Sequence, residues 1–151
     1  MHTRPRRAPA CIISVVLHSI QPFETRDGTC VYRLHGKHSL VEAVDLISRA
    51  IAECRRSGAR RLMIDVTGVE ELPVPTLVDR FLMVEDWAQE SKGLVVVAMV
   101  AHAEYIHPRK FGVTVALHLG LVCDVFTTEE PALRWLLETR LDALAQQGRA
   151  L

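Results

Sequence analysis

Short apolar runs alternate with longer amphipathic segments along the chain, and each kind predicts a different element. Runs rich in Val, Ile and Leu and bounded by polar residues are typical of buried strands. Five strands are predicted, at Cys11–Leu17, Thr29–Leu34, Leu62–Val66, Leu94–Val100 and Leu121–Phe126. The segment His18–Arg26, between the first two, is expected to be a loop, and so is Thr67–Leu72 after the third.

A helix is predicted between the second and third strands. Its apolar residues recur at steps of three and four, so they share one face; they are Leu40, Val44, Ile47, Ile51 and Cys54. Ser39 and Glu42 have the spacing of a capping box at its start. Gly58 can take the left-handed conformation that ends a helix.

Three more helices are predicted after the third strand. The first opens at Pro73 or Pro75, and the second has Pro108 in its first turn. The last begins at a capping box of Thr127 and Glu130. The residues expected to face the core are Leu77, Phe81, Val84 and Ala88 in the first of these helices and Leu133, Leu137, Leu141 and Leu144 in the last.

The predicted order is therefore β-β-α-β-α-β-α-β-α, which indicates an α/β fold with a five-stranded, mixed but mostly parallel sheet. The first two strands are expected to be antiparallel because their connection is short. If consecutive strands pair in order, right-handed crossovers place the helices on one face, and the other face needs further cover. Residues 10–145 are expected to form a single domain, 1–9 a flexible basic arm and 146–151 a frayed C-terminus.

The charge balance changes this picture little, since 18 Lys and Arg residues offset 18 Asp and Glu residues. Such a chain lacks the basic surface typical of a nucleic-acid-binding protein. No run approaches the roughly 18 apolar residues of a membrane span. The four cysteines form no CxxC pair, which favours buried, reduced thiols and a cytoplasmic location.

Residues 62–69 read Leu-Met-Ile-Asp-Val-Thr-Gly-Val, and residues 125–136 read Val-Phe-Thr-Thr-Glu-Glu-Pro-Ala-Leu-Arg-Trp-Leu. With Gly36 before the first helix, these stretches resemble the STAS domain family, above all the anti-sigma factor antagonists and their single-domain bacterial relatives. The first matches the family's apolar strand ending in Asp-x-(Ser/Thr)-Gly-Val, and the second its closing motif. The resemblance implies a STAS-like fold and a non-enzymatic regulatory or scaffolding module without a cofactor. Its partner would be another protein or a second copy of the chain.

The sequence departs from this family at the start of the second helix. Regulatory STAS domains carry Asp-Ser-Ser-Gly there, and a serine of that motif is phosphorylated. The aligned residues here are Pro73, Val74, Pro75 and Thr76. Val74 cannot accept a phosphate, and Thr76 stands where the family has glycine. The sequence therefore predicts a STAS-like module without a working serine phospho-switch.

One side of the second helix is the predicted partner-binding surface, because this helix borders the partner surface in STAS relatives. The candidate residues are Thr76, Arg80, Met83 and Trp87. Trp, Met and Arg are enriched in the cores of protein interfaces. The alternative is that Met83 and Trp87 only cover the rim of the core.

A second functional hypothesis is a small-molecule module. Parallel strands bring several loops to the carboxyl edge of the sheet, where open α/β sheets bind ligands. Helix N-termini at the same edge favour anions. The candidate residues for an anion, nucleotide or lipid are His35, Lys37, His38, Thr67, His102, His107, Arg109 and Lys110. Loop ends are also polar in proteins without a ligand, so both interpretations stay open.

No catalytic or metal site is predicted. His102, Glu104 and His107 lie in a loop that lacks helical spacing to fix three zinc ligands. No nucleophile elbow, phosphate-binding loop or dinucleotide fingerprint occurs. Asp65, near the end of a buried strand, is interpreted as an acceptor for loop amides rather than as a catalytic base.

Overall fold

The computed structural model describes residues 23–26 and 28–141 of the 151-residue chain. In this part of the chain, five strands pair in sequence order in one sheet. They are β1 (Phe23–Arg26), β2 (Thr29–Lys37), β3 (Arg61–Glu70), β4 (Val96–Val100) and β5 (Cys123–Phe126). β1 is antiparallel to β2, and the other neighbours are parallel. The predicted α/β fold with a mixed, mostly parallel sheet is confirmed.

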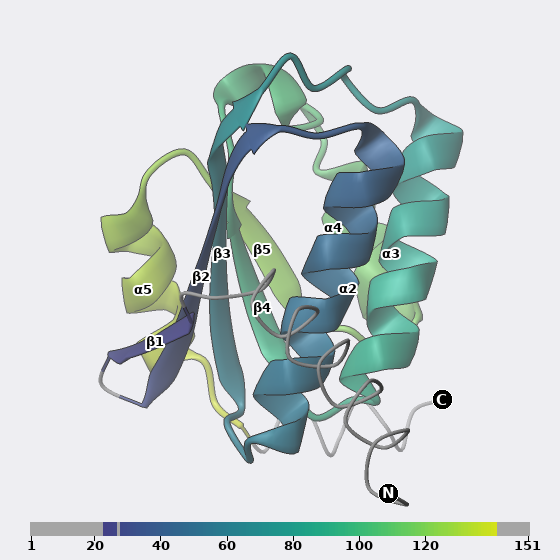
Figure 1. Ribbon diagram of the computed structural model, residues 1–151. Coiled ribbons are helices and arrows are strands. Elements are labelled where there is room, and N and C mark those ends of the chain that lie inside the picture. The colour runs from purple at the N-terminus through teal and green to yellow at the C-terminus, as the bar shows by residue number, and fades with distance from the viewer. Residues whose placement is uncertain (1–22, 27, 142–151) are drawn as a thin grey trace, which may run out of the picture.

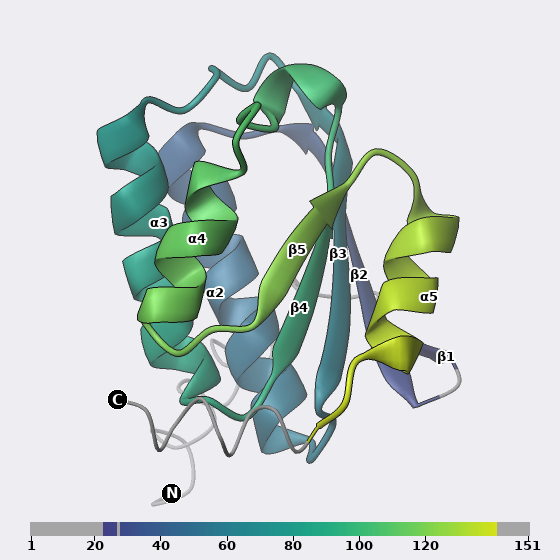
Figure 2. The same ribbon diagram turned by 180° about the vertical axis from the view of Figure 1, so that it is seen from behind.

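Helices cover both faces of the sheet (Figures 1 and 2). α2 (Leu40–Arg56), α3 (Leu77–Ser91) and α4 (Phe111–His118) lie on one face, and α5 (Glu129–Glu138) lies on the other. A short 3₁₀ helix, η1 (Ala103–Tyr105), follows β4. Right-handed crossovers between strands that pair in order put the connecting helices on one side. α5 follows the last strand and connects no two strands, so the crossover rule does not apply to it. It packs against β3, β4 and β5 from the other side of the sheet.

The first strand of the sheet is not the one that the sequence predicted. β1 occupies Phe23–Arg26, within the segment His18–Arg26 that was expected to be a loop, so that expectation is wrong for these four residues. Antiparallel pairing with the start of β2 makes this short segment a strand. The predicted strand Cys11–Leu17, the predicted arm 1–9 and the predicted frayed end 146–151 lie outside the described residues.

β3 continues four residues beyond its predicted end, so the loop expected from Thr67 is wrong for Thr67–Glu70. A register shift between Arg33 and His35 lets β2 and β3 resume their pairing, with His35 opposite Gly68. A bulge of this kind absorbs an extra residue and allows both strands to continue. β4 and β5 each begin two residues later than predicted.

α2 begins as predicted, at the capping box of Ser39. α3 begins later than expected, because its N-cap is Thr76 rather than Pro73 or Pro75. Thr76 and Asp79 form a second capping box, which satisfies backbone N–H groups of the first turn.

The starts of the two remaining helices also differ from the prediction. α4 begins after Lys110, so Pro108 precedes the helix instead of standing in its first turn. α5 begins after Thr128, whose side chain makes no capping hydrogen bond. The predicted capping box of Thr127 and Glu130 is therefore wrong.

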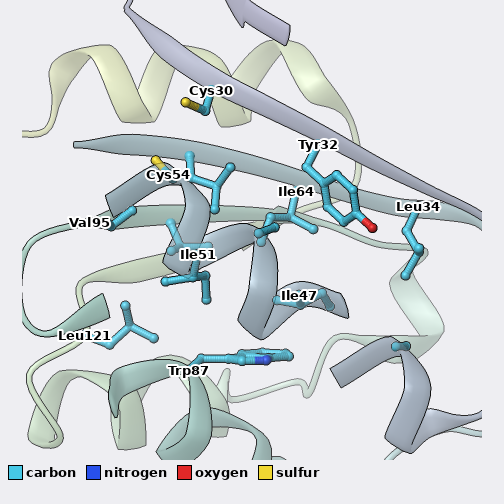
Figure 3. Packing of buried hydrophobic residues seen from close by; sticks show 14 of the residues in the cluster. Cys30, Tyr32, Leu34, Ile47, Ile51, Cys54, Ile64, Trp87, Val95 and Leu121 are labelled. Atoms are coloured by element: carbon cyan, nitrogen blue, oxygen red, sulfur yellow. The ribbon is translucent and has the colours of Figure 1, made fainter. Parts of the chain in front are cut away.

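The larger core lies between the sheet and helices α2 and α3 (Figure 3). Tyr32 and Ile64 of the sheet meet Ile47 and Ile51 of α2 there, and all four are buried. Cys54 is also buried, so three of the five residues predicted for the core-facing side of α2 are confirmed as core residues: Ile47, Ile51 and Cys54. Fully burying such side chains contributes roughly 1.5–3 kcal/mol each, which makes this layer the main source of stability.

α3 turns a different face to the core than the sequence predicted. Val84 is buried as expected, but Leu77 and Phe81 are 53% and 41% exposed. Trp87 faces inward instead, with 7% of its surface exposed, and its indole Nε1 donates a 3.2 Å hydrogen bond to the Val44 carbonyl. The helix is apolar on both sides, so periodicity alone did not identify its buried face.

A smaller core lies on the second face of the sheet, under α5. Ala132 and Leu136 pack there against buried residues of β2, β3 and β4. The predicted stripe of this helix is wrong for Leu137, which is half-exposed, and the helix ends before Leu141. Leu141 still packs against this core, and Leu133 is partly buried in it, while the position of Leu144 lies outside the described residues.

Candidate functional site

An apolar groove runs between α2 and α3 on the outer surface of the protein. We call it the α2–α3 groove; its apolar lining includes Val41, Val44, Leu82 and Met83. Further apolar side chains are exposed elsewhere on α3 and on the loop before it: Val74, Leu77, Val78 and Phe81. Val41 is 79% exposed, Val78 68% and Leu82 54%. The fold leaves this surface uncovered by any described segment.

Carboxylates surround the apolar part of the α2–α3 groove. Its lining includes Asp45, Asp79, Glu85 and Asp86 and no basic residue. Some of these groups have contacts within the protein, since Asp45 pairs with Arg49 at 3.0 Å and Asp86 accepts from a serine of α2 at 3.1 Å. The groove therefore combines an apolar surface with an acidic border.

The four residues predicted to bind a partner do not form one exposed surface. Trp87 lies in the core, and Arg80 donates from Nη1 to the Tyr105 carbonyl at 2.9 Å. Met83 is partly buried in the groove, and Thr76 is exposed as the N-cap of α3. The prediction that Trp87 forms part of a partner surface is thus at odds with its burial, and the exposed apolar side chains of α3 were not among the candidates.

Thr76 is the hydroxyl residue nearest the aligned phosphoacceptor position. Its Oγ1 accepts a hydrogen bond from the Asp79 amide at 3.1 Å, and Asp79 Oδ2 accepts from the Thr76 amide at 2.9 Å. Val74, at the acceptor position itself, is an exposed apolar side chain. The local chemistry of this segment therefore serves the start of α3.

Contacts at the carboxyl edge of the sheet join several residues of the predicted ligand set. His35 faces Gly68 across the β2–β3 pair. His102 Nε2 lies 3.0 Å from the Thr67 carbonyl oxygen, and His38 Nε2 lies 2.9 Å from the His35 carbonyl oxygen. These bonds link the segments after β2 and β4 to neighbouring backbone.

The basic residues of that set are divided between two places. Lys37 pairs with Glu71 at 3.0 Å. His107, Arg109 and Lys110 lie in the loop before α4, and Lys110 pairs with Asp124 at 2.7 Å. The N-termini of α2 and α3 already interact with carboxylates of their own capping boxes. The eight candidates are therefore not gathered around one space.

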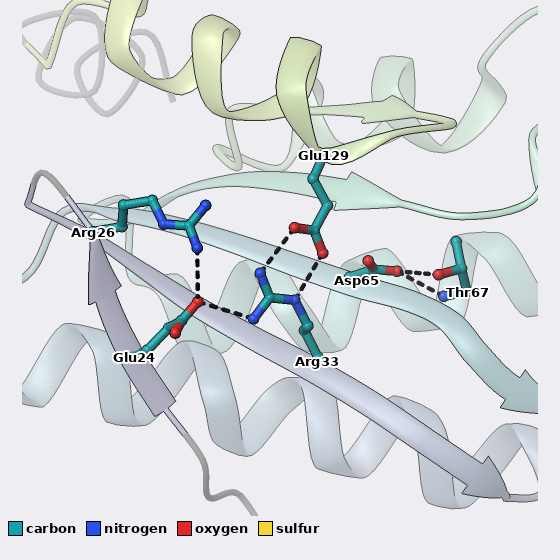
Figure 4. Close-up of polar contacts among 6 residues, drawn as sticks. All are labelled: Glu24, Arg26, Arg33, Asp65, Thr67 and Glu129. Atoms are coloured by element: carbon teal, nitrogen blue, oxygen red, sulfur yellow. Dashed lines mark hydrogen bonds and ion pairs between the residues drawn. The ribbon is translucent and has the colours of Figure 1, made fainter.

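A charged cluster joins β2 to α5 on the second face of the sheet (Figure 4). Arg33 donates to both carboxylate oxygens of Glu129 at 2.8 Å and to Glu24 at 2.9 Å. The hydrogen-bonded Arg33 guanidinium lowers the pKa of Glu129 to about 2. Sequence reasoning missed this cluster because its members come from distant segments, and no spacing along the chain relates them.

Asp65 lies next to this cluster in the middle of β3. Its Oδ1 accepts hydrogen bonds from the Thr67 amide at 2.8 Å and from the Thr67 hydroxyl at 2.6 Å. The interpretation of Asp65 as an acceptor for the following backbone is confirmed. Burial raises the pKa of the Asp65 carboxyl above its ordinary value.

Within the described residues, no group of three or more His, Cys, Asp or Glu side chains could hold a metal ion. None of the helices in the same ranges is long and apolar enough to cross a membrane.

No family model matches the chain, and no curated protein matches it. Among solved structures, an anti-sigma factor antagonist from Mycobacterium paratuberculosis superimposes with a TM-score of 0.50 at 19% identity, over 77% of this chain and 92% of that one. The chain has the STAS fold. The anti-sigma factor antagonist SpoIIAA in its unphosphorylated form gives a TM-score of 0.45 at 16% identity, over 78% of this chain and 99% of that one.

The STAS fold gives the two matched sequence stretches structural roles. In the first, Asp65 binds the Thr67 amide and Gly68 faces His35 across the sheet. In the second, Glu129 opens α5 and holds Arg33. The resemblance seen in the sequence is thus confirmed as a resemblance of fold, carried by residues that shape the sheet and its last helix.

Proposed function

We propose that this protein is a non-enzymatic regulatory module of the STAS family that binds a partner protein through the α2–α3 groove. The observation that carries the proposal is that Val41 and Leu82, which line this groove from its two helices, are exposed apolar side chains. A contiguous exposed apolar surface with a polar border marks an interaction site, because water contact with it is unfavourable.

The acidic border indicates the chemistry of the partner. Asp45, Asp79, Glu85 and Asp86 place negative charge around the apolar lining. A partner segment with apolar side chains flanked by Lys or Arg would complement both features. A second copy of this chain would complement them poorly, since a two-fold interface brings the same patch from each subunit together and sets carboxylates against carboxylates.

The comparison supports a regulatory role of this kind. The protein from Mycobacterium paratuberculosis is, by its description, an antagonist of an anti-sigma factor. We propose a similar bacterial, cytoplasmic role here, in keeping with the buried free thiols of Cys30 and Cys54. Val74 at the aligned acceptor position supports binding that is not controlled by serine phosphorylation.

Site-specific photo-crosslinking in the native host tests this proposal. A photoreactive amino acid would replace Leu82 or Val41 in the groove, and a matched control would replace Leu137. Leu137 is half-exposed but lies on α5, on the opposite side of the sheet. Adducts of one defined protein are expected from positions 82 and 41 and not from position 137.

Affinity measurements with the captured protein complete the test. Leu82→Asp should weaken the complex at least tenfold, roughly the effect of losing an interface hot spot, while Leu137→Asp should leave it unchanged. Equal adducts at all three positions would contradict the assignment of the groove. An adduct of twice the chain mass would show self-association and contradict the proposed partner.

A further inference from the structure

A partly open apolar cavity lies on the inner side of α3 and shares Leu40, Val44 and Met83 with the lining of the α2–α3 groove. It has a volume of about 130 Å³ and lies between the sheet and helices α2, α3 and α4. The sheet contributes Val66, Met99 and Val125 to its lining, and the helices contribute Ile47, Val84 and Val113. Figure 2 shows α4 and β5 on either side of this region.

Small residues leave this space unfilled. Ala43, Ala101 and Gly112 line it, and each offers at most one methyl group where a larger side chain would occupy volume. Protein interiors are normally packed to high density, and atoms around a void lose dispersion contacts. The folded chain therefore keeps an unfavourable space that an apolar molecule could fill.

The volume limits the size of such a molecule. An engineered apolar cavity of roughly 150 Å³ in another protein stays dry and binds benzene. By that measure the cavity takes an apolar group of about six carbon atoms. A long acyl chain would not fit without movement of the surrounding helices.

Basic side chains line the end of the cavity near the carboxyl edge of the sheet. Arg80, His107 and Lys110 line it beside Tyr105. Lys110 is paired with Asp124, but no carboxylate in the described part of the chain forms an ion pair with Arg80. Arg80 uses Nη1 for the 2.9 Å hydrogen bond to the Tyr105 carbonyl. Its guanidinium keeps further donors in a fork that matches a carboxylate.

We infer that this cavity binds a small monocarboxylic acid, with an apolar tail of about six carbons inside and the carboxylate on Arg80. The tail would restore the missing contacts, and the carboxylate would supply a counter-ion for Arg80, which forms no ion pair within the described ranges. This inference does not rest on the proposed protein partner, because it depends on Arg80 and on cavity residues such as Met99 and Val125 that do not line the α2–α3 groove.

Methionine methyl NMR with hexanoate as the probe tests the inference on the intact protein. Met83 and Met99 line the cavity, whereas Met63 lies in the core under α5 on the other face of the sheet. Saturable shifts of the Met83 and Met99 methyl signals are expected, and the Met63 signal should stay in place. Hexanol has a tail of the same length without the charge, so it should bind at least tenfold more weakly, since a charge-assisted hydrogen bond is lost.

Arg80→Gln gives the matched variant, because it removes the positive charge and the guanidinium fork while keeping a polar side chain at position 80. It should weaken hexanoate binding about tenfold and change hexanol binding less than twofold. Absence of any saturable shift at millimolar hexanoate would overturn the inference. Equal affinity for hexanoate and hexanol in the unsubstituted protein would overturn the assignment of the carboxylate to Arg80, even if the variant failed to fold.

Discussion

Arg33 of β2 and Glu129 of α5 stand 96 residues apart in the chain and form a two-pronged ion pair, with two hydrogen bonds of 2.8 Å. Paired parallel hydrogen bonds of this kind fix orientation as well as distance. The pair therefore holds the start of α5 against the second face of the sheet, where the helix buries Ala132 and Leu136.

Glu129→Gln should change how the stability of the protein depends on pH. The pKa of Glu129 is lowered to about 2 in the folded protein from an ordinary value of 4.5, so its contribution is present above pH 4.5 and is lost as the pH falls toward 2. The variant should lose about 1–2 kcal/mol at pH 7, an amount between exposed and buried ion pairs. Urea unfolding at several pH values measures the difference.

The same experiment must account for the titration of Asp65 and needs a control variant. The raised pKa of Asp65 acts in the opposite sense, because its contribution is present at low pH and is lost as the pH rises through its folded pKa. Glu129 is one of the groups that raise the pKa of Asp65, so Asp65→Asn in both proteins removes this interaction from the comparison. Glu130→Gln is the control, since Glu130 makes only an exposed pair with Arg134. A stability difference that stayed constant from pH 7 to pH 2 would contradict the assigned role of Glu129.

Gly68→Ala should destabilise the protein, because an added Cβ would overlap His35 Nδ1 and lie 3.1 Å from the Leu34 carbonyl oxygen. Overpacking of this kind costs about 1–3 kcal/mol. His35 is exposed, so His35→Ala alone should change stability by less than about 0.5 kcal/mol. The double variant should recover at least about 0.5 kcal/mol, since it removes the side-chain overlap. Additive effects in the unfolding free energies would show that the two positions do not compete for space.

Thr76→Ala should cost about 1 kcal/mol, because the Asp79 amide loses its acceptor at the start of α3. Thr76→Ser keeps a hydroxyl at the N-cap and should cost a few tenths of a kcal/mol or less. Chemical unfolding of the three proteins compares them directly. Equal losses in the two variants would mean that the capping hydrogen bond is not what position 76 contributes.

Trp87→Ala should cost about 3–5 kcal/mol, as expected for a large aromatic side chain removed from a core. The indole hydrogen bond to Val44 would be lost as well. Leu82→Ala, five residues earlier on the same helix, should cost less than about 0.5 kcal/mol because Leu82 is exposed. The reverse order of the two losses in thermal or urea unfolding would mean that α3 turns its other face to the sheet.

Features that depend on neighbouring residues could be predicted from the sequence. The Ser39 capping box needs only the next turn, and the apolar run of β4 indicates a strand buried on both faces. The apolar run that contains β5 gives the same expectation, but the four residues of β5 are only partly buried. β1 could not be predicted in this way, because Phe-Glu-Thr-Arg has no apolar run and its strand conformation depends on pairing with β2.

The candidate site was harder to predict than the fold. α3 carries apolar side chains on two sides, and only one side can face the core. Which side is buried depends on the shape of the space between α3 and the sheet. Trp87 fills that space, and Leu82 remains outside. The cavity beside Arg80 is formed by three helices and the sheet together. It therefore could not be predicted from the spacing of residues within one segment.

The position of α5 affects the synthesis of the chain. Until residues 129–138 have left the ribosome, Val31, Met63 and Val96 lack the helix that packs over them in the finished fold. Domains begin to fold while translation proceeds at roughly 5–20 residues per second, and exposed apolar surface in that interval attracts chaperones and other nascent chains. The α2–α4 side can assemble earlier, from segments that emerge first. The docking of α5 therefore removes the apolar side chains of Val31, Met63 and Val96 from contact with chaperones and other chains.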